Sequence, residues 1–509
     1  MLVAGLAGLV TLTQTIRRNL AQADDESAVL VALGARRIDR AVAGLIGVLP
    51  YLVVAPLVAV AVAYLASPLF PLGSARTLEP QLGFRADPAV LFLGAVVWLI
   101  VLALLTFAVA WVGAARLRNA SRAPSRRWLG GVTAVRGAVP GAIGVRYGLQ
   151  PGGTRRALRR TAFAGVVVAV AGIVGSMVFV RSLDSFTGSP NRYGIGFDLT
   201  LEVPASAAGS VTGQLAADPR LAAVAVSSAG VVNAADRSVN GFAIEAVKGT
   251  INPTVRSGRL PANDNEVAVG PRLLGDLGLH LGDQMTVGSG DEQRALTVVG
   301  TVYSPTSESA EFNREVVLSP ATLESVSRNP SVNVLIRVAP GVDVADVFDD
   351  LDARFPFAVS DESIPHEPGP VRNLEQIARL PLALALFFAV FGAAAVVQSL
   401  FLTARERRRD LAVLRGLGFR RRQVVMVLLG AAASVAAVAL VLGVPIGVLA
   451  GRIGWNAVAR SLYVNPAVVI PIVALLGLGL AVLAGALLAA LAPASLVLHR
   501  SPGSTLRTE

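Results

Sequence analysis

The 509-residue sequence contains no cysteine, one lysine and three histidines. Without cysteine, no disulfide can form in any part of the chain. The single lysine, Lys248, does not follow a glycine, so it cannot be the lysine of a Gly-x-x-x-x-Gly-Lys-Ser/Thr phosphate loop. His280, His366 and His499 lie far apart, without the spacing of metal ligands. We therefore expect no ATP hydrolysis by this chain, no catalytic residues, no cofactor and no metal.

Charged residues are also scarce, at 16%, whereas hydrophobic residues make up 53% and the mean hydropathy is +0.62. Runs of roughly 20 apolar residues, enough to cross a bilayer, occur six times. They are Val42–Ala66, Pro88–Val112, Ala162–Val180, Pro381–Leu402, Val424–Ala450 and Ala467–Ala492. They contain no Asp, Glu, Lys, Arg or His, which argues against an ion-coupled carrier. A seventh, shorter run is Leu2–Ile16, and it has no charged segment before it, so we do not interpret it as a signal peptide.

The net charge of +11 comes from arginines that are concentrated in alternate segments between the runs. Eleven lie between Arg116 and Arg160, whereas only Arg452 and Arg460 lie between the last two runs. In membrane proteins, the arginine-rich segments between spans usually face the cytoplasm. A nucleic-acid-binding surface would instead have its arginines spread over the folded chain. Seven spans would place the C-terminus in the cytoplasm and the N-terminus outside.

An internal repeat divides the chain into two related halves. The segment Glu26–Arg37 recurs as Asp410–Arg421, and the same offset of 384 residues pairs Gln14 with Gln398 inside the preceding apolar runs. Repeated membrane units are a common plan for transport proteins. The second half has one more span than the first, so the first block would lack its opening span.

Between Arg181 and Arg379 the sequence has the character of a folded extracytoplasmic domain. Phe197–Val203 alternates as a strand does, Ser206–Ala217 can form a helix, and Leu221–Val226 has the character of another strand. Val332–Val338 is strand-like, and apolar residues recur at helical spacing from Val344 to Phe355. Two β-α-β-like units separated by an insertion predict an α+β domain of ferredoxin-like type. Asp349, Asp350 and Asp352 fall on the polar side of the second helix, where we expect solvent rather than catalysis.

The predicted fold is a membrane all-α helical bundle of about seven transmembrane helices in two related halves, with an inserted extracytoplasmic α+β domain. The linker before the third span is rich in Arg, Gly, Ala and Ser, and we expect it to be mobile or to lie on the lipid headgroups. The predicted parts are a first transmembrane block 1–115, a basic cytoplasmic linker 116–160, a transmembrane helix 161–180, the outer domain 181–377, a second transmembrane block 378–493 and a cytoplasmic tail 494–509.

The phrase Arg405–Gly418, followed by Arg420–Gln423 and two spans, resembles the signature of the FtsX-like permease family of ABC transporters. The closing segment Pro493–Arg507 is similar to that of the same family. In the outer domain, Ser257–Pro261 and Asn265–Gly270 resemble the MacB-type periplasmic core domain. The resemblance covers nearly the whole chain and is stronger in the second half.

The resemblance implies that the two repeated cytoplasmic segments bind a separate ABC ATP-binding subunit. Apolar residues beside charged ones suit such a contact. The residues assigned to it are Glu26, Leu30, Leu33, Gly34, Arg36, Arg37, Asp410, Leu414, Arg415, Leu417, Gly418, Arg420 and Arg421. Alternatively, each segment is an interfacial helix whose arginines only fix the topology.

Two further sets of residues are candidates for helix packing. Gly443, Gly447 and Gly451 recur every four residues, which lets another backbone approach closely. Their partner could be a second permease copy, the other half or a helix of the same chain. Gln14 and Gln398 could hydrogen-bond between helices or simply pack near the interface.

The resemblance implies a non-catalytic permease subunit of the cell membrane. Such a subunit would couple ATP hydrolysis by its partner to movement of residues 181–377, for export or extraction of a lipoprotein, peptide or drug-like substrate. Two other functions fit the same sequence. One is a mechanotransmitting regulator of a cell-wall hydrolase that transports nothing, and the other is a passive sensor without an ATPase.

Overall fold

The fold was analysed in a computed structural model of the full chain. The structure describes residues 36–69, 83–84, 87–116, 139–149, 156–289, 292–303, 312–327, 330–360, 363–377, 379–406, 413, 416 and 418–498. Two compact units result. One is the permease block, with residues up to Val180, Arg379–Arg452 and from Ile470 onward, and the other is the outer domain, with Arg181–Ala378 and Ile453–Val469.

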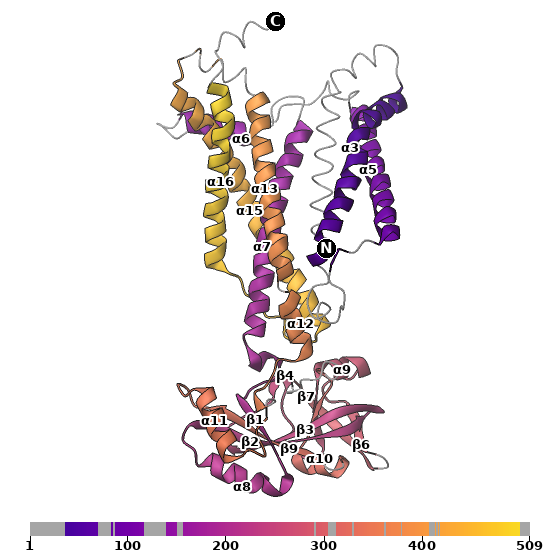
Figure 1. The fold of residues 1–509 in the computed structure, drawn as a ribbon, viewed down its shortest axis with the longest axis vertical. Coiled ribbons are helices and arrows are strands. Elements are labelled where there is room, and N and C mark those ends of the chain that lie inside the picture. The colour runs from indigo at the N-terminus through magenta and orange to yellow at the C-terminus, as the bar shows by residue number, and fades with distance from the viewer. Residues whose placement is uncertain are drawn as a thin grey trace. The chain divides into compact units, whose positions relative to one another are not determined.

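Six helices in the described part are long and apolar enough to cross a membrane, which confirms the predicted class of fold (Figure 1). They are α3 (Arg37–Ala66), α5 (Pro88–Arg116), α7 (Arg156–Thr187), α13 (Arg379–Glu406), α15 (Arg421–Ser461) and α16 (Ile472–Leu498). The predicted span Leu2–Ile16 lies outside the described residues. The two helices of the first half, α3 and α5, pack together through Val48, Leu52 and Leu102.

In the second half, α7 packs against both α13 and α15. Phe388 of α13 is fully buried where Gly172 of α7 leaves room, because a Cβ at Gly172 would lie 2.3 Å from the Phe388 ring. On the other side of α13, small residues of α15 and α16 form a cluster with Leu400. These helices therefore meet mainly through alanine and glycine, as is usual where lipid surrounds the protein.

The linker contains a helix, which corrects the expectation that it buries nothing. α6 (Val139–Leu149) packs on the start of α15, and its Ile143 joins a cluster with Val424, Val427 and Leu428. Residues 116–160 as a whole are rich in arginine, and this composition hid the helix. Within α6 itself, the only described charged residue is Arg146, near the end of the helix.

The outer domain contains a nine-stranded mixed sheet with the order β1-β9-β2-β3-β8-β5-β7-β4, and β6 pairs with β2 and β7. The strands are β1 (Leu199–Val203), β2 (Leu221–Ala234), β3 (Arg237–Lys248), β4 (Thr254–Gly258), β5 (Glu266–Val269), β6 (Gln284–Ser289), β7 (Glu292–Tyr303), β8 (Val316–Val317) and β9 (Ser331–Val338). β9 lies between β1 and β2 and is antiparallel to both. This is the split β-α-β arrangement predicted from the sequence.

The two largest hydrophobic cores of the outer domain are covered by helices, and two smaller clusters lie beside them. α8 (Ala205–Ala216) and α11 (Val344–Arg354) cover β1, β9 and the start of β2, and Leu201, Leu215 and Leu351 meet between them. The second core lies under α9 (Pro271–Leu277) and α10 (Pro320–Val326), where they meet β5 to β8. The sequence predicted the first core, whereas the second belongs to the insertion that it left undefined. α12 (Gly369–Ile377) follows the domain and precedes α13.

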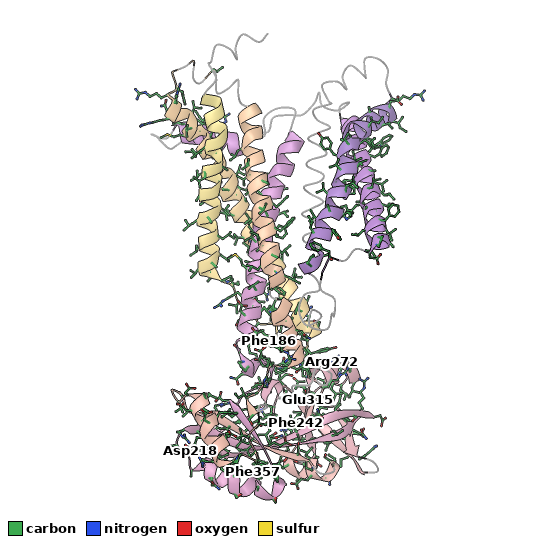
Figure 2. The ribbon with its side chains drawn as sticks, in the orientation of Figure 1. Phe186, Asp218, Phe242, Arg272, Glu315 and Phe357 are labelled. Carbon is green, nitrogen blue, oxygen red and sulfur yellow. The ribbon has the colours of Figure 1, made fainter. Side chains whose placement is uncertain are left out.

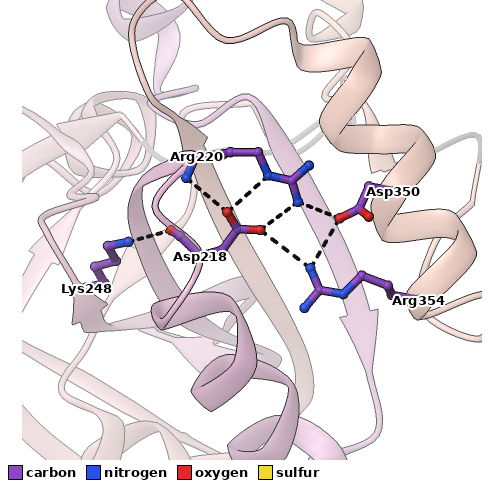
Figure 3. Close-up of polar contacts among 5 residues, drawn as sticks. All are labelled: Asp218, Arg220, Lys248, Asp350 and Arg354. Atoms are coloured by element: carbon purple, nitrogen blue, oxygen red, sulfur yellow. Dashed lines mark hydrogen bonds and ion pairs between the residues drawn. The ribbon is translucent and has the colours of Figure 1, made fainter.

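A cluster of ion pairs joins the two β-α units of the first core (Figure 3). Arg220 binds Asp218 at 2.7 Å and Asp350 of α11 at 2.5 Å, and Arg354 bridges the same two carboxylates. The hydrogen bonds from Arg220 lower the pKa of Asp218 to about 2. Asp350, predicted to face solvent, is thus half exposed and ion-paired, and its role is structural.

Candidate coupling sites at the two ends of α15

The helices that follow the two repeated segments begin in the same way. α3 starts at Arg37, and the backbone N–H of Arg36 donates to Asp39 Oδ2 at 2.8 Å. α15 starts at Arg421, and the N–H of Arg420 donates to Gln423 Oε1 at 2.8 Å. Both bonds satisfy a backbone donor that the helix leaves unpaired. The 384-residue offset therefore relates local structure as well as sequence.

Most residues assigned to ATPase binding lie outside the described part of the chain. These are Glu26, Leu30, Leu33, Gly34, Asp410, Leu414, Arg415 and Leu417, and Gln14 is outside it as well. Arg36, Arg420 and Arg421 are exposed. Gly418 has a φ of +96°, a left-handed conformation that favours glycine and lets the chain turn before α15.

The N-terminal end of α15 is held by α6. Phe419 and Ile143 pack on the same cluster of α15 residues. The helices approach so closely that a Cβ at Gly144 would lie 2.2 Å from the carbonyl oxygen of Val427, and one at Gly148 would lie 1.9 Å from Ser434 Oγ. The linker thereby contacts the segment that leads into α15, which the sequence analysis did not anticipate.

The three glycines of α15 face α7 of the same chain. A Cβ at Gly443 would lie 2.8 Å from Val170, and one at Gly447 would lie 2.6 Å from both Val174 and the carbonyl oxygen of Ala171. Gly451 lies against Gly175 in the same manner. In this structure the partner is thus neither a second copy nor the first half. Gln398 lies in α13, and its side chain is not among those described.

At its other end, α15 runs on into the outer domain as part of one compact unit. We call residues 453–469, with the outer-domain residues that bind them, the outer joint. Backbone carbonyls of this segment accept hydrogen bonds from the rest of the outer domain. Asn313 Nδ2 donates to Leu462 at 2.8 Å, Arg256 Nη1 and the Tyr303 hydroxyl donate to Tyr463 at 3.1 Å and 3.4 Å, and Arg192 Nη2 donates to Asn465 at 3.3 Å. The turn is thus bound through its main chain.

Aromatic rings fill the centre of the outer joint. Trp455 is fully buried, and its ring lies 5.8 Å from that of Phe186, which is labelled in Figure 2 at the end of α7. Phe186 also makes an edge contact with Tyr193 at 5.6 Å, and Arg192 lies over its ring. These contacts connect the outer end of α7 to the outer end of α15.

The sequence analysis missed the outer joint and assigned residues 453–469 to the second transmembrane block. One signal was available. Arg452 marks the end of the lipid-compatible part of α15, and Trp455 follows after it. The φ of +58° at Tyr463, which is uncommon for a residue other than glycine, could not be read from the sequence.

A polytopic helical protein with an inserted α+β domain between two of its spans is the class that these elements define. Two family models match it: an FtsX-like permease C-terminal model at residues 382–502 and a MacB-like periplasmic core domain model at residues 161–354. These matches confirm, over the matched residues, the resemblance to the FtsX-like permease family and to the MacB-like periplasmic core domain. No curated protein matches the chain.

Two solved structures are similar to part of the chain. The periplasmic region of MacB from Actinobacillus actinomycetemcomitans is 15% identical, covers 33% of this chain and 86% of its own, and has a TM-score of 0.23. A domain of a permease protein from Porphyromonas gingivalis is 14% identical, covers 37% of this chain and 98% of its own, and also has a TM-score of 0.23. With such TM-scores these likenesses carry no argument about function.

Proposed function

We propose that the chain is the membrane subunit of an ABC-type complex, with a separate ATPase bound to residues 24–40 and 405–423. The observation that carries this proposal is the shared geometry of the two helix starts. Both repeated segments lead directly into a long helix through the same backbone cap at Arg36 and Arg420. Two helix starts with the same local structure suit a partner that binds both segments in the same way.

The route from the cytoplasmic segment to the outer domain is one uninterrupted helix. α15 has 41 residues, so it extends about 60 Å at 1.5 Å per residue, roughly twice the hydrocarbon thickness of a bilayer. Its start packs on α6, its middle on α7, and its end belongs to the outer domain. A shift imposed at Phe419 would therefore move the outer joint without an intervening flexible loop.

The proposed outcome of this movement is export or extraction of a lipoprotein, peptide or drug-like substrate. In the proposed orientation, residues 181–377 are extracytoplasmic and the protein is a multi-pass component of the cell membrane. The ATPase is the obligatory partner, and a second permease copy is a further proposed one. The domain division given from the sequence is part of the proposal, with 453–469 moved to the outer domain.

Site-specific cross-linking tests the proposal, because the chain has no cysteine to give background. A Val413→Cys variant, exposed at 49%, is co-expressed with a candidate ABC ATPase and treated with a thiol cross-linker. We expect one adduct with the ATPase. The matched control is Val473→Cys in α16, exposed at 86% within a span, which should give none.

Labelling from outside the cell can contradict the proposed orientation. If a membrane-impermeant thiol reagent labels Val413→Cys in intact cells, the segment is extracytoplasmic and the proposal is wrong. If the ATPase binds but a cell-wall hydrolase is recovered with the outer domain and no substrate moves, the chain is a mechanical regulator rather than a transporter.

A further inference from the structure

A cavity of about 450 Å³ opens in the outer domain beside Tyr463. Its walls come from α9 and the turn that follows it, from the adjacent strands β4 and β7, and from the outer joint. All of these residues belong to one compact unit. The volume lies within the range of roughly 300–1,000 Å³ that is typical of small-molecule sites.

One side of the cavity is polar and cationic. Arg256 is exposed, and its bond to the carbonyl of Tyr463 uses only one of the five guanidinium N–H groups. Ser257 Oγ and Thr301 Oγ1 lie 2.5 Å apart in the same wall, and His280 also lines the cavity. These groups suit an oxyanion.

α9 and the turn that follows it contribute the apolar lining. Pro271, Leu274 and Leu279 belong to it, and Tyr463 of the outer joint also lines the cavity. The Tyr463 ring lies so close to α9 that a Cβ at Gly275 would stand 3.2 Å from it. A short hydrocarbon segment placed here would bury its surface against three aliphatic side chains and a ring.

We propose that this cavity binds a small amphipathic anion, with its phosphate or carboxylate on Arg256 and its hydrocarbon part between Leu274 and Leu279. Because Arg256 also holds the carbonyl of Tyr463, the ligand shares a residue with the outer joint, and binding is coupled to the position of the end of α15. This deepens the proposed function by naming a ligand class, but the binding itself requires neither nucleotide nor ATPase.

The test uses hexyl phosphate as probe and the purified full chain in nanodiscs of neutral phosphatidylcholine. Saturation-transfer NMR measures the dissociation constants of hexyl phosphate, hexanol and inorganic phosphate. Hexanol has only the hydrocarbon chain of the probe, and inorganic phosphate has only its anionic group. We expect saturable binding of hexyl phosphate that is at least about tenfold tighter than that of hexanol or inorganic phosphate. Repeating the titration in nanodiscs with anionic phosphatidylglycerol identifies the source of the ligand, because competition indicates a lipid and its absence a soluble molecule.

Two variants locate the site. Arg256→Gln should weaken hexyl phosphate at least about tenfold and leave hexanol unchanged. Arg294→Gln, an exposed arginine seven residues from Thr301 on the same strand, is the matched control and should have no effect. Ser257→Asp adds a repelling carboxylate while the Arg256–Tyr463 bond stays, so it replaces the first variant if Arg256→Gln does not fold.

Three results would overturn the proposal. They are equal binding of hexanol and hexyl phosphate, equal effects of the Arg256 and Arg294 variants, and no saturation at any accessible concentration. A failure of ATPase cross-linking at Val413 with intact hexyl phosphate binding would reject the proposed function alone.

Discussion

Different interactions stabilise the permease block and the outer domain, each within itself. In the permease block, glycines bring helices so close that an added methyl group at Gly144, Gly172 or Gly447 would overlap a neighbour. The outer domain has two side-chain cores covered by helices, and the ion pairs around Asp218 and Asp276 lie in it. Shape complementarity dominates in the first, whereas hydrogen bonds and charge add to burial in the second.

The difference follows from the solvent of each region. Lipid tails are as apolar as leucine side chains, so membrane helices gain little by burying leucine side chains between them. They associate through close backbone contact instead. In water, burial of large side chains is favourable, and polar groups need partners. α15 crosses both environments, with glycines in its span and a buried tryptophan in the outer joint.

Trp455→Ala should give the largest effect, because it removes a fully buried indole between α7 and α15. Truncations of this kind cost about 3–5 kcal/mol. Thermal unfolding of the purified chain in detergent measures the loss. Trp98→Ala in α5, where the side chain is 52% exposed, is the matched control and should melt like the parent. Equal shifts for both would mean that the outer joint does not stabilise the chain.

Gly447→Leu tests the packing inside the membrane. Its side chain would meet Val174 and the carbonyl of Ala171, and overpacking of this kind costs about 1–3 kcal/mol. Gly479→Leu in α16, which has nothing within 4 Å, should be tolerated. The readout is again thermal unfolding, together with the oligomeric state in detergent. If Gly447→Leu dissociates a dimer and leaves the melting temperature unchanged, the glycines face a second copy after all.

The contrast between the two regions also explains what could be read from the sequence. Hydropathy predicted the six described spans because burial in lipid depends on composition alone. Alternation predicted β1, which buries one face, and helical spacing predicted α11, which does the same. β9 has the sequence of a strand, although it is buried on both faces at Val334, Leu335 and Ile336. α6 was missed because its glycines pack through what they lack, and a missing side chain leaves no apolar pattern.

The outer joint could not be predicted for a different reason. The burial of Trp455 depends on Phe186, which lies on a helix far away in the sequence, and Tyr463 is bound through its carbonyl rather than its side chain. Backbone acceptors are the same in every residue, so the sequence does not mark them. The ATPase-binding residues remain a prediction, since most of them lie outside the described part of the chain.

Acid should weaken the outer domain and spare the permease block. The pKa of Asp218 is lowered to about 2 from 3.8, so its contribution is complete above pH 4 and is lost as the pH falls from about 4 to 2. Since Arg220 and Arg354 are over a third exposed, we expect only about 1 kcal/mol from this carboxylate. Asp218→Asn should lower the melting temperature at pH 6, and the difference from the parent should shrink toward pH 3. A difference that stays constant with pH would contradict the ion-pair assignment.

The smallest expected effect compares the two halves of the permease block. Asp39→Ala removes the acceptor of the Arg36 N–H at the start of α3, and Gln423→Ala removes its equivalent at the start of α15. Each should cost about 0.5–1 kcal/mol, because the lost bond is exposed and water replaces part of it. If both segments bind an ATPase in the same way, each variant should reduce stimulated ATP hydrolysis to a similar extent in reconstituted complexes. Loss of activity with Gln423→Ala alone would show that only the second half is a docking site, and that the repeat is retained for folding.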